Sequence, residues 1–301
     1  MQARIWSAIT GAALAWGTNG VATRAALNDG VPPIAMVAIR AVIAAALLYV
    51  LLRMRGRGVP RERPSWHIGL VQGLFQLSIP FVLMTLAYDN ASAGFVGLLI
   101  ALIPLGTALG AHFLLQNEPL FAAKVVGLAV AFSGVAFLLL SGDSGLESGG
   151  RPLPAAMLTL GAVASISFAG VYARGHADEF DPMELAFMQF AVGIVLIGAT
   201  MFVWEGMPGS ISTWGWALIL YMATVGSVIP FLLFFWLLQQ VTATKASLIG
   251  YVVPLISLVA GIVLLDEKLQ AGLAVGGVLI LIGVVLTDRA ERGADARFRV
   301  G

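Results

Sequence analysis

The chain repeats itself at an offset of 150 residues, and both copies consist of apolar segments long enough to cross a membrane. The triplet Ile79-Pro80-Phe81 returns as Ile229-Pro230-Phe231, and Pro104 returns as Pro254. Each copy holds five such segments, so the second copy enters the bilayer upside down relative to the first. Inverted repeats around a midplane cavity are the usual architecture of alternating-access transport. The repeat therefore predicts a solute carrier.

The composition supports a membrane protein. Hydrophobic residues make up 59% of the 301 residues and charged residues only 11%, whereas soluble domains contain about 45–50% and about 25%. The apolar segments are long and continuous, which predicts an all-α integral membrane protein. The chain has no cysteine, so disulfides, thiol catalysis and thiolate metal sites are excluded.

A membrane span needs about 20 mostly apolar residues. Ten segments meet this length to within a few residues, namely 5–26, 33–52, 67–88, 92–115, 120–140, 154–174, 183–204, 213–238, 243–265 and 270–287. We therefore expect a first five-helix repeat at 1–140, a Gly/Ser-rich linker at 141–153, a second five-helix repeat at 154–288 and a cytoplasmic tail at 289–301.

Basic residues indicate the orientation, because Lys and Arg concentrate in cytoplasmic loops. Arginines cluster in the 53–66 loop and in the tail, whereas Arg24, Arg151 and Lys268 are the basic residues on the opposite side. With ten spans, the two termini and the 53–66 loop fall on one side of the membrane. We therefore expect cytoplasmic N- and C-termini.

Four prolines lie well inside predicted spans as two repeat-related pairs, Pro80 with Pro230 and Pro104 with Pro254. Each proline removes a backbone donor and frees a carbonyl, which a membrane helix tolerates where neighbours or cavity water satisfy it. We interpret them as hinge or cavity-shaping residues. The alternative is that they only shape helix packing.

Polar and aromatic residues inside the spans are the candidates for solute contacts, because polar groups at membrane depth are costly unless they face a partner or water. The candidate substrate-binding residues are Trp16, Asn19, Arg40, Gln72, Gln76, Tyr221, Ser227 and Tyr251. The larger amides are favoured over the hydroxyls, since Ser and Thr often bond their own helix or allow close helix packing.

Arg40 is the exceptional charge, about seven residues into the second span. It breaks the repeat, because its counterpart is Phe190. One interpretation is a counter-ion for a substrate carboxylate. The other is a structural ion pair or carbonyl cap near Asp29 and Asp89.

Several classes of function lack the residues that they need. The acidic residues fall at or near the ends of the predicted spans, so a mid-membrane proton carrier of the multidrug-efflux type is disfavoured. We find no phosphate loop, zinc-ligand spacing or catalytic triad, and the linkers are too short for a nucleotide-binding domain. The basic residues form no nucleic-acid-binding face. We therefore expect no enzyme activity, metal, cofactor or nucleic-acid partner, and transport driven by gradients rather than ATP.

Motifs in both halves point to a family. Trp16-Gly17-Thr18-Asn19 lies in the first span, and Ala91-Ser92-Ala93 leads into the fourth. An acidic residue followed by two glycines occurs at the end of each repeat, as Glu118, Gly127 and Gly134 and again as Glu267, Gly276 and Gly283. In this order the chain resembles the EamA-type ten-helix exporters of the drug/metabolite transporter superfamily, and among them the bacterial aromatic amino-acid exporter.

The resemblance implies ten helices around a central cavity, with the last helix of each repeat at the periphery. It also implies an exporter in the bacterial inner membrane that moves aromatic and other neutral amino acids, and similar metabolites, by alternating access. The expected partners are this small-molecule substrate and the lipid bilayer, and a monomer is compatible with it. Alternatives are a nucleotide-sugar or phosphate-ester exchanger, which needs clustered Lys and Arg in the cavity, and a non-transport membrane assembly protein.

Overall fold

The computed structural model describes residues 2–59, 63–114, 122–143, 145–146, 150–246 and 249–298, and its regular elements are helical throughout these ranges. The first half of the chain forms α1 (Gln2–Asn28), α2 (Pro33–Met54), α3 (Arg63–Val71), η1 (Gln72–Ser78), α4 (Ile79–Asn90), α5 (Ala93–Ile100), α6 (Ile103–Leu114) and α7 (Ala122–Ser141). The second half forms α8 (Pro152–Gly175), α9 (Pro182–Trp204), α10 (Thr213–Ala223), η2 (Thr224–Val228), α11 (Ile229–Gln240), α12 (Ala243–Ala246), α13 (Ile249–Leu265) and α14 (Ala271–Phe298).

Each predicted span coincides with one of these elements or with a run of consecutive elements. Prolines begin α2, α8 and α9, because a proline at the first helical position loses no hydrogen bond. The last helix, α14, extends to Phe298, beyond the last predicted span.

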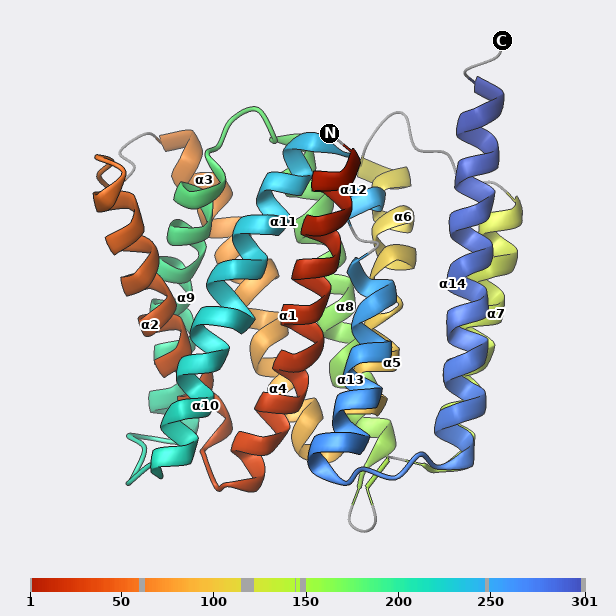
Figure 1. Cartoon of the computed structure of the whole chain (residues 1–301), viewed down its shortest axis with the longest axis horizontal. Coiled ribbons are helices and arrows are strands. Elements are labelled where there is room, and N and C mark those ends of the chain that lie inside the picture. The colour runs from red at the N-terminus through yellow and green to blue at the C-terminus, as the bar shows by residue number, and fades with distance from the viewer. Residues whose placement is uncertain are drawn as a thin grey trace.

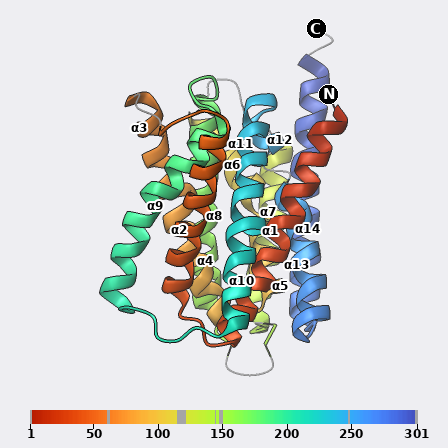
Figure 2. The ribbon, with the colours of Figure 1, turned by 60° about the vertical axis from the view of Figure 1, so that its left-hand side comes forward.

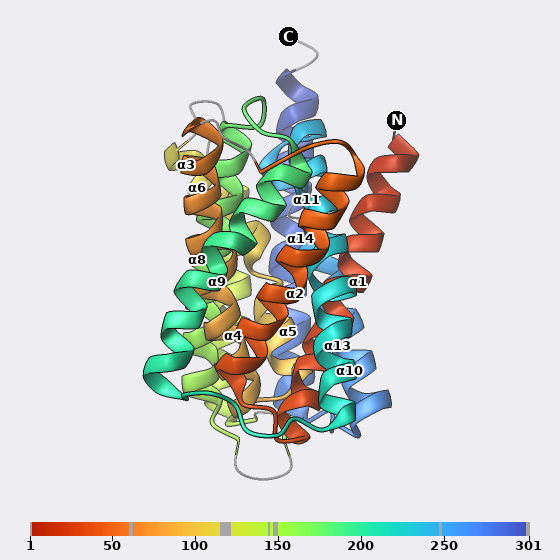
Figure 3. The same cartoon turned by 90° about the vertical axis from the view of Figure 1, so that its left-hand side faces the viewer.

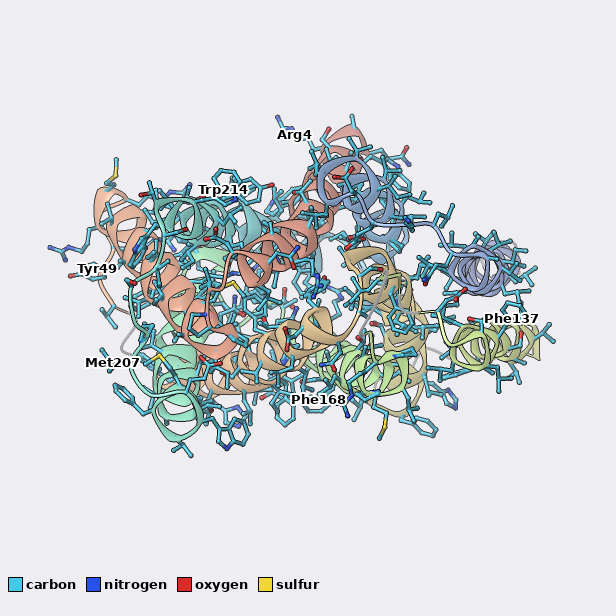
Figure 4. The ribbon with its side chains drawn as sticks, turned by 90° about the horizontal axis from the view of Figure 1, so that it is seen from below. Arg4, Tyr49, Phe137, Phe168, Met207 and Trp214 are labelled. Carbon is cyan, nitrogen blue, oxygen red and sulfur yellow. The ribbon has the colours of Figure 1, made fainter. Side chains whose placement is uncertain are left out.

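Six helical stretches in the described ranges are long and apolar enough to span a membrane. They are 33–54, 66–90, 93–114, 152–175, 182–204 and 213–240, with shorter apolar helices at 125–141, 252–265 and 271–286. Large apolar side chains cover the outer surface, as Figure 4 shows for Trp214 on α10 and Phe137 on α7, whose side chains are 60% and 43% exposed. The chain is a multi-pass membrane protein. Its crossing of the bilayer ten times and the cytoplasmic position of its ends stay predictions.

The long helices run side by side between two ends of the molecule (Figure 1). The start of α1 and the end of α14 lie at the same end, and turned views show the same common helix direction (Figures 2 and 3). We call this the terminal end and the other the opposite end. Helices α7 and α14 pack on each other at the periphery (Figure 1).

The helices pack as inverted repeats do. Helix α1 contacts α11 and α13 of the second repeat, and its counterpart α8 contacts α4 and α6 of the first. Repeat-related helices also pack on each other, α2 on α9 and α7 on α14, and α5 packs on α13 of the other repeat. Individual hydrogen bonds repeat as well. Arg24 Nη1 donates to the Tyr88 carbonyl over 2.6 Å, and Arg174 Nη1 donates to the Leu238 carbonyl over 2.7 Å.

Glycines allow the close contact between α7 and α14. A Cβ atom on Gly134 would lie 2.7 Å from the Gly276 carbonyl oxygen, and one on Gly283 would collide with the backbone of Ala131. Small residues of this kind let helix backbones approach closely in a membrane, where packing rather than water expulsion drives association. The repeated glycines after the acidic residue therefore have a structural explanation.

Two of the four prolines follow a π-helix. η1 ends just before Pro80 and η2 ends just before Pro230, and in each the hydrogen bonds span five residues, from Ile79 N to the Leu74 carbonyl and from Ile229 N to the Thr224 carbonyl. The other pair differs. The helix is interrupted at residues 101–102, directly before Pro104, to give α5 and α6, whereas Pro254 lies inside α13. The two repeats therefore share one proline distortion and differ in the other.

Candidate functional site

A cavity of about 100 Å³ lies between the two repeats. Residues from both repeats line it at positions related by the 150-residue offset. These lining pairs are Trp16 and Ile166, Phe81 and Phe231, Met84 and Phe234, Ile100 and Gly250, and Ile103 and Val253. The cavity therefore occupies the region where the repeats meet, as the inverted architecture predicts.

The two repeats contribute differently to the cavity wall, although the first repeat also supplies apolar residues, namely Trp16, Phe81, Met84, Ile100 and Ile103. The described polar side chains all come from the first repeat, namely Asn19, Thr23, Arg40, Gln76, Thr85, Tyr88 and Thr107. The second repeat contributes small and apolar residues, namely Ile166, Gly170, Phe231, Phe234, Ala243, Ala246, Ile249, Gly250 and Val253. This division suits a solute that has a polar end and an apolar end.

Arg40 joins the two repeats at the polar side. Its Nε donates to Ser227 Oγ over 2.7 Å and its Nη2 to the Gly226 carbonyl over 2.9 Å. The guanidinium centre lies 4.2 Å from the centroid of the Phe81 ring. Among the described residues it forms no ion pair, so the ion-pair interpretation with Asp29 or Asp89 is not what the structure shows.

The proline at the end of η2 explains why Arg40 finds a carbonyl to bind. Pro230 has no N–H, so the Gly226 carbonyl four residues earlier has lost its α-helical donor. Arg40 supplies that donor from the other repeat. In the first repeat, the carbonyl of Phe75, five residues before Pro80, accepts a hydrogen bond of 2.6 Å from Ser165 on α8. Each π-helix is thus stabilised by a side chain of the opposite repeat.

Aromatic rings connect Arg40 to the apolar side. Phe81 and Phe231, which are repeat partners, have ring centroids 6.0 Å apart, and Phe231 contacts Trp16 edge-on at 5.5 Å. Phe234 contacts the same indole at 5.8 Å. The Ile-Pro-Phe triplet that revealed the repeat therefore places one aromatic ring from each half on the cavity wall.

Two of the predicted amides line the cavity. Asn19 packs against Gly226, where a Cβ atom would collide with the amide oxygen of Asn19. Gln76 also lines the cavity and is the repeat partner of Gly226. Neither Asn19 Oδ1 nor Gln76 Oε1 has a hydrogen-bond partner among the described residues. Buried amides without partners are costly, so these two are available for a polar ligand.

The other predicted residues have different places. Gln72 is fully buried and donates to the Ala169 carbonyl over 2.9 Å, so it joins the repeats beside the cavity. Ser227 is the acceptor for Arg40, and the hydroxyl groups of Tyr221 and Thr18 lie 2.6 Å apart at the contact of α10 with α1. The side chain of Tyr251 lies outside the described residues. None of the four prolines is on the cavity wall.

Several lining residues were not among our predicted candidates. Phe81, Thr85 and Tyr88 follow one another at helical spacing on α4, and Thr107 lies on α6. Their spacing from Pro80 and Pro104 is the only sequence signal that could have selected them. Threonines in membrane helices usually bond their own backbone, and nothing in the residue type distinguishes the ones at a cavity.

The cavity extends toward the terminal end and stops short of the opposite end. Ala243 and Ala246 of α12 line it, whereas their repeat partners Ala93 and Val96 of α5 do not, although all four side chains are buried. One end of the cavity is therefore closed by α5, and the equivalent element at the other end is part of the wall. This asymmetry is what one conformation of an alternating-access carrier shows.

The wall carries one kind of charge. Among the described residues that line the cavity, Arg40 is the charged one, and none of these residues is a carboxylate. In the part of the chain that the structure describes, no three His, Cys, Asp or Glu residues gather as metal ligands would. The arrangement can bind and orient an organic anion or zwitterion.

Comparison with known proteins also indicates a transporter. The model of the EamA-like transporter family matches residues 5–140 and again residues 153–288. The chain is 27% identical over 286 residues to the transporter YvbV of Bacillus subtilis strain 168, covering 93% of this chain and 90% of YvbV. It is 29% identical over 279 residues to the inner membrane transporter YedA of Escherichia coli K12, covering 90% of this chain and 86% of YedA.

A solved crystal structure has the same fold. It superimposes with a TM-score of 0.70 at 22% identity and covers 95% of this chain and 97% of its own. The family model matches the sequence twice, once in each half, as expected for a repeat. The motifs, the inverted packing and this double match agree, and the chain belongs to the EamA-like transporter family.

Proposed function

We propose that the chain exports neutral amino acids with aromatic or aliphatic side chains, and similar metabolites, from the bacterial cytoplasm across the inner membrane. Transport occurs by alternating opening of the two ends of the cavity and is driven by a gradient rather than by ATP. The family supports transport itself. The substrate class rests on the divided polarity of the cavity.

The polar side suits the backbone of an amino acid. Arg40 provides a fixed positive charge for the carboxylate, and charged hydrogen bonds to a guanidinium are among the strong ones. The unpartnered amide oxygens of Asn19 and Gln76 are acceptors for the ammonium group. Arg40 and the two amides can therefore meet the carboxylate and the ammonium group of one zwitterion.

The apolar side suits the side chain. Phe231, Phe234, Ile249 and Val253 of the second repeat line the cavity. Burying an apolar side chain of this size contributes about 1.5–3 kcal/mol. A small or charged side chain gains less there, which favours aromatic and aliphatic amino acids.

The direction and the location follow from the orientation. Ala243 and Ala246 of α12, which lies toward the terminal end (Figure 1), line the cavity, and the arginine distribution predicts that this end is cytoplasmic. We propose that the site is loaded from that side. The name of the relative YedA describes it as an inner membrane transporter, which supports the same membrane for this chain.

Nucleotide sugars and phosphate esters fit less well. A phosphate ester with two or more negative charges needs several cations, and among the described lining residues Arg40 stands alone. A non-transport assembly role has no support from the family. The amino-acid proposal is therefore preferred over both.

Counterflow in proteoliposomes tests the proposal. Vesicles that contain the purified protein are loaded with unlabelled phenylalanine, and we expect transient accumulation of labelled phenylalanine that leucine inhibits and UDP-glucose does not. Ala246→Trp fills the cavity and should abolish counterflow, whereas Val259→Trp places the same side chain on the 60% exposed outer face of α13 and should not. Counterflow of UDP-glucose without counterflow of any amino acid would transfer the function to phosphate esters.

A further inference from the structure

Glu267 connects the two repeats at the closed end of the cavity. It lies in the segment between α13 and α14, and its carboxylate accepts hydrogen bonds from the backbone N–H of Ala93 over 2.7 Å and of Gly94 over 3.3 Å. These groups begin α5, a helix of the other repeat. A carboxylate is favourable at a helix N-terminus. In the sequence Glu267 comes just before the last helix, yet its carboxylate binds the start of α5 instead.

The same residue fixes the contact between α5 and α13. The backbone N–H of Glu267 donates to the Gly261 carbonyl over 3.2 Å, and a Cβ atom on Gly261 would collide with the Glu267 carboxylate. Nearby, Cβ atoms on Gly94 and Gly97 would lie within 2.9 Å of Leu258 and 2.7 Å of Ser257. The glutamate thus sits at a close contact between the two repeats.

The charged and titratable groups around Glu267 come from few elements. Helix α1 contributes Arg24, whose charge acts on the carboxylate, and α4 contributes Tyr88, which lines the cavity and lies within electrostatic range. Asp266 and Lys268 flank it in its own segment. Helices α5 and α13 contribute backbone groups and glycines at this contact.

We propose that Glu267 is a proton-binding site of this transporter, and that a bound proton favours the conformation in which the end of the cavity at α5 is closed. The ligand is a proton from the solvent, taken by the Glu267 carboxylate when that end closes and burial removes the carboxylate from water. The proposal rests on the family's transport activity and not on the identity of the solute, so it holds for any substrate.

The direction of the pH dependence follows from the burial of the carboxyl group. Burial raises the pKa of Glu267 above its ordinary value, and the two backbone hydrogen bonds and Arg24 only partly oppose this. When the end opens, water reaches the carboxyl and its pKa returns toward the ordinary value of about 4.3. Proton binding to Glu267 therefore stabilises the closed state fully at pH values below the ordinary pKa. This stabilisation is lost as the pH rises through the raised pKa of the closed state.

The protonated carboxyl fits its surroundings. Oε1 keeps the short bond from Ala93, and Oε2, whose contact with Gly94 is the longer one, carries the proton. The proton that binds from the solvent when this end closes returns to the same solvent when the end opens. It therefore biases the conformational equilibrium and is not itself carried across the membrane.

Single cysteines test the proposal cleanly, because the chain has none of its own. Val96→Cys reports the closed end at α5, and Ala246→Cys is the reference at the repeat-related position, which is equally buried but lines the cavity. We would measure the rate of modification of each purified variant by a thiol reagent in detergent from pH 8 to pH 4.5. The ratio of the two rates cancels the ionisation of the thiol itself.

We expect the ratio of the Val96→Cys rate to the Ala246→Cys rate to fall several-fold as pH falls. Glu267→Gln, which resembles the protonated acid, should give a low ratio at every pH. The matched control is Asp143→Asn, because Asp143 accepts from the backbone N–H of Gly272 over 2.7 Å at the start of α14, away from the cavity. It should leave the pH dependence unchanged.

Two results would overturn the proposal: a ratio that does not depend on pH, or a pH dependence that persists in Glu267→Gln. The cysteine variants with native Glu267 are sufficient for the first result, so the test does not depend on the folding of Glu267→Gln. No solute is present in the experiment. Failure of the amino-acid assignment would therefore leave this result untouched, and failure here would leave the amino-acid counterflow assay untouched.

Discussion

Replacing Arg40 by glutamine should reduce the affinity for solutes that carry a carboxylate and affect their amides much less. The guanidinium has five N–H donors, and the structure assigns two of them, to Ser227 over 2.7 Å and to Gly226 over 2.9 Å. The remaining donors belong to a side chain on the cavity wall. A hydrogen bond to a charged group contributes about 1.5–3 kcal/mol, which corresponds to an increase of roughly 10- to 150-fold in the half-saturation concentration.

The assay is inhibition of labelled phenylalanine counterflow by phenylalanine and by phenylalanine amide. Arg40→Gln should raise the inhibition constant of phenylalanine by that factor relative to the inhibition constant of phenylalanine amide. Ser227→Ala is the control, because it removes one partner of Arg40 and keeps the charge, so the ratio of the two inhibition constants should stay as in the wild type. Arg40→Lys should retain part of the preference for the acid. Equal losses for acid and amide in Arg40→Gln would refute the counter-ion role and leave Arg40 as the structural donor to the carbonyl that Pro230 leaves free.

Other predictions follow from single contacts. Phe234→Ala should weaken phenylalanine by roughly 10- to 100-fold, because about 1.5–3 kcal/mol of apolar burial is lost, and should change alanine little; competition for counterflow measures both, and equal effects would contradict an apolar wall. Gly134→Leu should lower the thermal unfolding midpoint, because its Cβ lies 2.7 Å from the Gly276 carbonyl and overpacking costs about 1–3 kcal/mol; an unchanged midpoint would contradict the tight contact of α7 with α14. Glu205→Gln should destabilise the start of α2 by about 1 kcal/mol, since its carboxylate accepts from Ile34 N over 2.9 Å; denaturant unfolding measures the loss.

The sequence was sufficient for the family, the helical class and the position of the helices. The apolar segments are long and continuous, so hydrophobicity alone locates them, and the 150-residue repeat relates the two halves. The same repeat predicted that Pro80 and Pro230 would distort equivalent helices, and both follow a π-helix. What these distortions would look like was not predicted, because the choice between a kink and a π-helix depends on neighbouring donors such as Arg40 and Ser165.

The site was only partly visible in the sequence. Trp16, Asn19, Arg40 and Gln76 are unusual residues at membrane depth, and they lie on the cavity wall. Their partners are not predictable from local spacing, because they come from the other repeat. Arg40 and Gly226 are 186 residues apart in the chain, and Glu267 and Ala93 are 174 apart. Gln72 is the same residue type as Gln76 and lies four residues before it, yet its side chain donates a hydrogen bond to a backbone carbonyl of α8.

The central claim is that the cavity between the repeats is the site through which the solute passes, and protection of a cavity cysteine by substrate tests it most directly. The measurement is the rate of thiol modification of Val253→Cys, on the cavity wall, as phenylalanine is titrated, with Val259→Cys on the exposed face of the same helix as the control. We expect protection of Val253→Cys alone, half-complete at the concentration that half-saturates counterflow. Saturable phenylalanine counterflow by this variant with no protection of its cysteine would contradict the account.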